Sequence, residues 1–158
     1  DKTQPPKKVQ ALAGQRVVAV SAAEYHSLAL AANGDVWSWG LGSSGRLGHG
    51  DQQRQLLPRK VEAFAGQHVV AVSAGRDHSI ALTADGAVLS WGRLGHGNAQ
   101  GQLLPKKVES FTGQRVVAVS AGGAYSLALT ADGTAWSWGD GDWGMLGHGD
   151  QQQQLLPK

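Results

Sequence analysis

The amino-acid sequence repeats itself three times, and this periodicity restricts the possible folds more than any other feature. Four prolines mark the period at intervals of roughly 50 residues, namely Pro6, Pro58, Pro105 and Pro157. Between them, a Val-Val-Ala-Val-Ser-Ala stretch and a Trp-Gly pair recur at the same phase. A period of this length is typical of solenoids and propellers, in which neighbouring units bury each other's apolar faces.

We divide the chain, residues 1–158, into repeats at 6–57, 58–104 and 105–156 of a single propeller segment. The second repeat lacks a counterpart of residues 41–45, whereas the third keeps this insert. An insert that one repeat omits is expected to be a surface loop.

Each repeat has the pattern of short β-strands. Residues 17–20 are rich in β-branched valine, and residues 27–30 alternate between small or polar and apolar side chains. Asn33-Gly34 is a strong hairpin signal between two such runs. A further short strand is predicted to begin at Val9 and Leu12, after the proline, with counterparts in the other repeats. The sequence therefore predicts an all-β fold of four-stranded antiparallel propeller blades.

The text of the second repeat, from Val69 to Gly92 and on through Leu-Gly-His-Gly and Pro-x-x-Val, resembles the repeat of the regulator-of-chromosome-condensation (RCC-type) propellers. This resemblance extends from Pro6 to Pro157 and implies a β-propeller, which in this family usually closes with seven blades. Three repeats would make a partial propeller or half of an oligomeric ring. Three alternatives stay open for the exposed edges: a longer protein, head-to-tail self-association, or a different covering subunit.

Composition excludes several classes of protein. The chain has no cysteine, which excludes disulfides and thiolate zinc sites. No apolar stretch reaches the roughly 20 residues that a membrane-spanning helix needs. The net charge of +2 gives little support to a polyanionic partner. A cysteine-free chain favours an intracellular location without fixing the compartment.

The motifs that suggest chemistry have simpler explanations. Gly40-x-Gly42-x-x-Gly45 matches the dinucleotide fingerprint, but the following Leu-Gly-His-Gly does not predict the helix that this site needs. His49, His96 and His148 recur once per repeat, so they belong to separate blades and are expected to be structural. No nucleophile, base or carboxylate pair stands out from the repeat. We therefore expect no enzyme activity, cofactor or metal.

Five tryptophans occupy aligned positions and are expected to pack between blades, whereas Trp143 lies in the variable insert beside Asp142. Trp143 is either a partner anchor or folds back onto its own blade. The variable pairs Glu24-Tyr25 and Arg76-Asp77, and the insert that ends at Arg46, are further candidates for partner contact.

Basic doublets recur in phase and would form an arc on one side of the assembly: Lys7-Lys8, Arg59-Lys60 and Lys106-Lys107. An arc of this kind can meet phosphates, but acidic residues follow two of the doublets. Protection of strand edges is therefore the preferred interpretation, and nucleic-acid binding is not expected.

The sequence predicts a non-catalytic protein-protein interaction scaffold, as a subunit or segment of a larger assembly, whose protein partners it does not identify. Two alternatives stay open: guanine-nucleotide exchange on a small GTPase, which the resemblance implies, and chromatin binding through the basic arc. Both are functions of sites rather than of the fold, so the repeat alone does not distinguish them.

Overall fold

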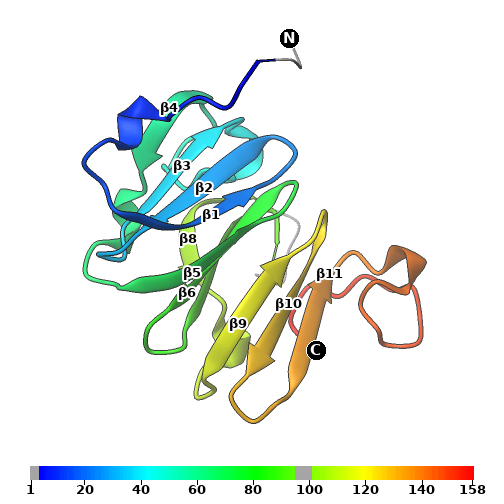
Figure 1. Ribbon diagram of the computed structural model, residues 1–158. Coiled ribbons are helices and arrows are strands. Elements are labelled where there is room, and N and C mark those ends of the chain that lie inside the picture. Colours follow the sequence, from blue (N-terminus) through cyan, green and yellow to red (C-terminus); the bar gives the residue numbers. More distant parts are fainter. Residues whose placement is uncertain (1–3, 95–100) are drawn as a thin grey trace.

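The computed structural model describes residues 4–94 and 101–158, which form three antiparallel β-sheets that stand side by side (Figure 1). Each sheet is one blade, and consecutive strands along the chain are neighbours in it. The first blade consists of β1 (Val17–Ala22), β2 (His26–Ala31), β3 (Val36–Gly40) and β4 (Gln55–Lys60). The second consists of β5 (Val69–Ala74), β6 (His78–Thr83), β7 (Val88–Gly92) and β8 (Gln102–Lys107). The third contains β9 (Val116–Ala121), β10 (Tyr125–Thr130) and β11 (Ala135–Gly139).

The prediction of an all-β fold of propeller blades is confirmed, with one difference in the third blade. Its sheet has three strands, and the position of a fourth strand is held by an isolated bridge between Gly139 and Gln154. Ser137 and Lys158 also exchange two backbone hydrogen bonds of 3.1 Å. The segment that follows β11 therefore follows the same path as β4 and β8.

The strand predicted after each proline is wrong. The residues after Val9, Val61 and Val108 form single 3₁₀ turns, which are η1 (Gln10–Leu12), η3 (Glu62–Phe64) and η4 (Glu109–Phe111). The fourth strand lies earlier and contains the proline itself, as β4 contains Pro58. Proline lacks a backbone N–H, so it is tolerated in the outermost strand of a sheet, where one side needs no ladder bond.

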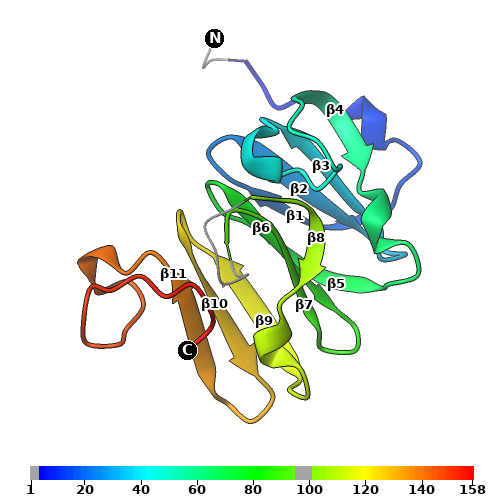
Figure 2. The same ribbon diagram turned by 180° about the vertical axis from the view of Figure 1, so that it is seen from behind.

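Seen from behind, the three blades again stand side by side (Figure 2). The apolar core lies between the blades rather than within any one of them. Leu28 and Leu30 of the first blade pack with Phe64 and Trp91 of the second. The Phe64 and Trp91 rings meet edge to face, with centroids 5.4 Å apart. One sheet face alone would stay exposed, so each blade depends on its neighbour for burial of apolar area.

The same arrangement recurs between the second and third blades. Ile80 and Leu82 of β6 pack there with Phe111 and Trp138 of the third blade. The tryptophans of the Trp-Gly pairs are expected to pack between blades. Trp91 and Trp138 are fully buried there.

Glycine in the Trp-Gly pair is required by a close backbone approach. Gly92 has φ +86°, and a Cβ atom there would lie 2.3 Å from the carbonyl oxygen of Asp77. Only glycine combines this left-handed conformation with such proximity. The pair thus fixes how tightly the third strand of a blade passes the start of the second.

The part of the chain that the structure describes contains no helix long and apolar enough to cross a membrane. Its helical elements are 3₁₀ turns of three residues.

Candidate functional site

Five of the predicted contact residues meet at one place, the loop end of the junction between the first two blades. Arg46 follows the turn η2 (Ser43–Gly45) of the first blade and is buried. Its guanidinium donates to Asp77 Oδ1 at 2.7 Å and to the carbonyl oxygen of Arg76 at 2.7 Å, both on the second blade. Its Nε also donates to the carbonyl oxygen of Ser43 at 2.8 Å. Arg46 therefore ties two blades together, and its charged group is not offered to solvent.

The outer side of this junction consists of exposed side chains. The Arg46 guanidinium carbon lies 5.8 Å from the centroid of the Tyr25 ring, within cation–π range. Glu24 and Arg76 are exposed and approach to 3.8 Å across the two blades. Hydrogen bonding to Glu24 and its negative charge raise the pKa of Tyr25. We call Glu24, Tyr25 and Arg76 the junction surface.

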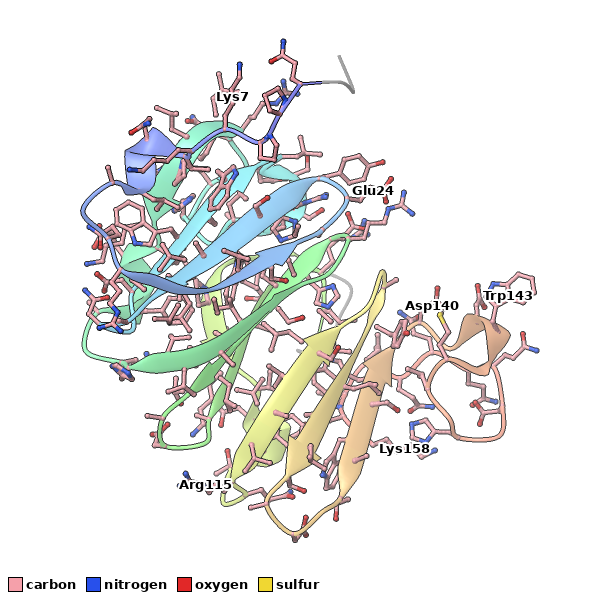
Figure 3. All side chains as sticks on the ribbon, viewed as in Figure 1. Lys7, Glu24, Arg115, Asp140, Trp143 and Lys158 are labelled. Carbon is pink, nitrogen blue, oxygen red and sulfur yellow. The ribbon has the colours of Figure 1, made fainter. Side chains whose placement is uncertain are left out.

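Trp143 lies apart from Glu24 of the junction surface (Figure 3), and Asp142 directly precedes it in the chain. Both belong to the turn η5 (Asp142–Gly144), which is held by a bond from the Asp142 N–H to Asp140 Oδ1 at 3.0 Å. Trp143 has φ +61°, and 91% of its surface is exposed. The Trp143 side chain therefore does not fold back onto its own blade, and its contact with a partner stays a prediction.

The basic doublets are partly neutralised. Lys60 pairs with Asp35 at 3.1 Å, and Arg59 lies 3.8 Å from Asp51. The other predicted members of the arc are exposed, namely Lys7, Lys8, Lys106 and Lys107. Asp35 and Asp51 weaken the positive potential around Arg59 and Lys60, and the interpretation of the arc as protection of strand edges stays a prediction.

The buried histidines contact serine hydroxyls of the next blade. His26 Nε2 lies 2.7 Å from Ser79 Oγ, and His78 Nε2 lies 2.8 Å from Ser126 Oγ. Because Ser79 donates its proton to the carbonyl oxygen of Arg46, His26 donates to Ser79 through Nε2. Burial, as the largest cause, lowers the pKa of His26 to about 4 and that of His78 to about 3. Both rings are therefore neutral at pH 7.

A second set of histidines bonds within its own blade. His49 Nε2 lies 2.9 Å from Ser38 Oγ, and His148 Nε2 lies 2.9 Å from Ser137 Oγ. His96 lies outside the described residues. Among the residues that are described, no three His, Cys, Asp or Glu side chains gather as metal ligands. The serine partners were not predicted from the sequence, although the equal spacing of Ser38 from His49 and of Ser137 from His148 was a signal for them.

The glycine fingerprint at residues 40–45 forms the short 3₁₀ turn η2. A dinucleotide site needs the N-terminus of a longer helix at this point, and residues 46–54 continue without one. The tight-turn interpretation of these glycines is the one that the backbone adopts.

The comparisons with known proteins agree with this architecture. The family described as "Regulator of chromosome condensation (RCC1) repeat" matches residues 33–82, 85–129 and 132–158, and a second profile of the same repeat matches residues 17–46. The chain belongs to the RCC1 repeat family. The suspected resemblance is thereby confirmed.

Relatives of this RCC1-repeat chain include large and functionally diverse proteins. Human E3 ubiquitin-protein ligase HERC2 is 45% identical over 92 residues, which are 54% of this chain and 2% of HERC2. Among solved structures, human WBSCR16 matches with a TM-score of 0.84 and 25% identity, over 93% of this chain and 40% of that one. Prp20p of Saccharomyces cerevisiae matches with a TM-score of 0.78 and 27% identity, over 90% of this chain and 37% of that one. The chain thus spans less than half the length of each of these relatives.

Proposed function

We propose that the chain works as a non-catalytic protein-protein interaction scaffold whose contact site is the junction surface, Glu24, Tyr25 and Arg76. The observation that carries this proposal is the ion pair between buried Arg46 and partly exposed Asp77, which joins the loops from which these three side chains project. A contact surface that is already ordered loses less conformational entropy on binding.

The residue types also favour a protein partner. Tyrosine and arginine are enriched among the residues that dominate protein interfaces. The junction surface presents one of each beside a carboxylate, so it can accept both aromatic stacking and charge pairing. Such mixed polarity suits a protein surface better than a uniformly charged polymer.

A second candidate function rests on the similarity to Prp20p, whose structure was described together with its binding to Gsp1p and histones. This similarity supports guanine-nucleotide exchange on a small GTPase, or chromatin binding, as alternatives. Release of fluorescent GDP from a panel of small GTPases tests the first alternative. A rate that the chain does not accelerate would remove exchange and leave the scaffold.

The scaffold proposal is tested by measuring Kd for a captured partner with two variants. Tyr25→Ala combined with Arg76→Ala removes the exposed side chains without touching the Arg46–Asp77 pair, and Kd should weaken by at least about tenfold. Arg115→Ala is the matched control, because Arg115 is an exposed arginine at the opposite end of the blades (Figure 3). Equal affinity of the wild type and the double variant would contradict the junction surface as the contact site.

A further inference from the structure

The third blade has an open face where the first two blades are covered. Leu28 and Leu30 of β2, and their counterparts in β6, are buried because the next blade packs on them. The same positions in β10 are Leu127 and Leu129, which are 41% and 39% exposed. Two apolar side chains that align with core residues are therefore left without their usual cover in this chain.

The first blade has the opposite open face. Val61 and Val108 are buried in the two interfaces, whereas the aligned Val9 is exposed. Val72 and Val119 pack against the interface cores, whereas the aligned Val20 is 74% exposed. The exposed face of the first blade therefore has the residues that would cover the exposed face of the third blade.

The insert loops of the first and third blades differ in the same way: one is covered by the next blade and the other is not. The turn η2 lies against the fourth strand of the next blade, where a Cβ at Gly45 would be 2.6 Å from the Gln102 carbonyl oxygen. The N–H of Gly50 donates to the Leu103 carbonyl oxygen at 3.0 Å. The aligned glycines of the third blade, Gly144 and Gly149, have no described atom within 4 Å of such a Cβ.

In a head-to-tail arrangement the η5 loop would lie against β4 of the next chain, and β4 is uncovered in this structure. Leu103 of β8, which η2 covers, is 37% exposed, whereas the aligned Leu56 of β4 is 83% exposed. Trp143 occupies the position of Ser44 in its turn, with the same positive φ. If the contact between η2 and β8 is repeated one blade further on, Trp143 comes to lie beside the fourth strand of the incoming blade.

We propose that the open face of the third blade binds the open face of the first blade in a second copy of this chain, head to tail. A second copy is the occupant because both halves of the interface are present in one chain, in the register that its two internal interfaces already use. Leu127 and Leu129 then pack on Val9 and Val20 of the second copy, and Trp143 lies beside its Leu56.

Polar groups at the two open faces also match. In the internal interfaces, Ser21 Oγ accepts from the Ala74 N–H at 3.0 Å, and Ser73 Oγ accepts from the Ala121 N–H at 2.9 Å. Ser120 of the third blade is the next serine in this series, and the Ala22 N–H of the second copy is its partner. Tyr125 stands where His26 and His78 stand, opposite Ser27 of the second copy.

The test is sedimentation analysis of the wild type and of two single variants. The wild type should approach twice the 16.5 kDa chain mass as concentration rises. Leu129→Arg blocks the third-blade face and Val20→Arg blocks the first-blade face, so each variant alone should be monomeric. A wild type that is still monomeric at about 1 mM, the Kd of a contact worth only about 4 kcal/mol, would overturn the proposal.

A mixture of the two variants distinguishes head-to-tail association from other dimers. In a mixed dimer, the intact third-blade face of the Val20→Arg chain can meet the intact first-blade face of the Leu129→Arg chain. Mixing the two variants should therefore restore dimers. If two like faces met instead, one variant would dimerise alone, and that result would contradict the proposal.

Matched controls are available on the first strand of each outer blade, β1 and β9. Val18 and Val117 are exposed in the same way as Val70 of the covered second blade, so they lie outside the interface. Val18→Arg and Val117→Arg should therefore dimerise as the wild type does, and monomeric controls would overturn the assignment of faces.

Trp143→Ser, which copies the first repeat, tests the loop contact. This variant should keep the wild-type circular dichroism spectrum and raise the dimer Kd by at least about tenfold. An unchanged Kd would remove Trp143 from the interface. None of these variants changes a residue of the junction surface, so their outcome is measured separately from that of the scaffold proposal.

Discussion

At the scale of single residues, the three repeats differ in the polar side chains at which one blade meets the next. Arg46 is buried against Asp77, whereas the third repeat has Met145 at the position of Arg46 and Ala124 at that of Asp77. His26 and His78 likewise give way to Tyr125. Each junction therefore combines a shared apolar core with its own polar contacts.

Replacement of Arg46 by methionine should destabilise the fold. The change leaves Asp77 and the Arg76 carbonyl without their donor, and we expect a loss of about 1–3 kcal/mol in the free energy of unfolding. Urea denaturation of Arg46→Met measures this loss, with Arg76→Ala as an exposed-arginine control that should change stability by less than about 0.5 kcal/mol. Equal stability of the two variants would contradict the role of Arg46 as a tie between blades.

Stability should fall in mild acid because of the two buried histidines. Their pKa values in the folded chain, about 4 for His26 and about 3 for His78, lie below the ordinary value near 6.5. Unfolding therefore takes up protons below about pH 6.5, and the free energy of unfolding should drop by about 1.4 kcal/mol per pH unit for each histidine. The contribution is complete above that pH and is lost as pH falls toward the folded values.

Urea denaturation between about pH 7 and about pH 4.5 measures this slope. His78→Tyr copies the third repeat, and Gly75, against which the His78 ring lies, is unchanged. Because one of the two buried histidines is removed, the variant should lose about half of the pH dependence. A variant whose slope equals that of the wild type would show that His78 is not the titrating group.

At the scale of elements, the sequence was sufficient for the strands that carry clear signals. The valine-rich strands, the hairpin turns and the Trp-Gly strands all lie where alternation and Asn-Gly or Asp-Gly pairs predict them. The sequence alone misplaces the fourth strand, because a proline such as Pro58 is expected at a strand boundary. Proline is compatible with an outer strand, and only the sheet order shows that β4 is outermost.

The candidate site was predictable in position but not in detail. Alignment of the repeats identified Glu24, Tyr25, Arg46, Arg76 and Asp77 as variable residues. It could not show that Arg46 is buried while the side chains of Tyr25 and Arg76 are exposed, because that depends on which blade packs against the loop. The sequence period predicts the position of a residue within its blade, whereas the exposure of its side chain depends on the neighbouring blade.

The glycine of the Trp-Gly pair should be far less replaceable than a turn glycine with the same backbone angle. Gly92 and Gly66 have φ +86° and +82°, but no described atom lies within 4 Å of a Cβ at Gly66. Gly66→Ala should cost about 1–2 kcal/mol through the left-handed conformation alone. Gly92→Ala adds a backbone clash with Asp77 and should cost at least about 2 kcal/mol more, as measured by urea denaturation. Equal losses would contradict the close approach.

At the scale of the whole molecule, stability depends on contacts between adjacent blades. The middle blade has two neighbours, and β6 is buried along its whole length. The third blade has one neighbour, and β10 alternates between buried and partly exposed residues. In such an array, stability is approximately the sum of blade terms and nearest-neighbour terms.

Hydrogen exchange should therefore be slower in β6 than in β10. The measurement is made by mass spectrometry on the Val20→Arg variant, in which association of the open faces is blocked. Local opening of the third blade breaks one interface, whereas opening of the second breaks two, so the β6 amides should be the better protected. Equal protection of β6 and β10 would indicate that the chain unfolds only as a unit.

The position of the proline within β4 has a consequence for how chains of this kind can change length. A sequence period that starts at Pro58 contains the end of one blade, three strands of the next and the start of its outer strand. Duplication or loss of one period therefore makes its joint in an outer strand, and neither apolar cluster contains the proline at that joint. Genetic recombination at this point can alter the number of blades while every hydrophobic interface is inherited whole.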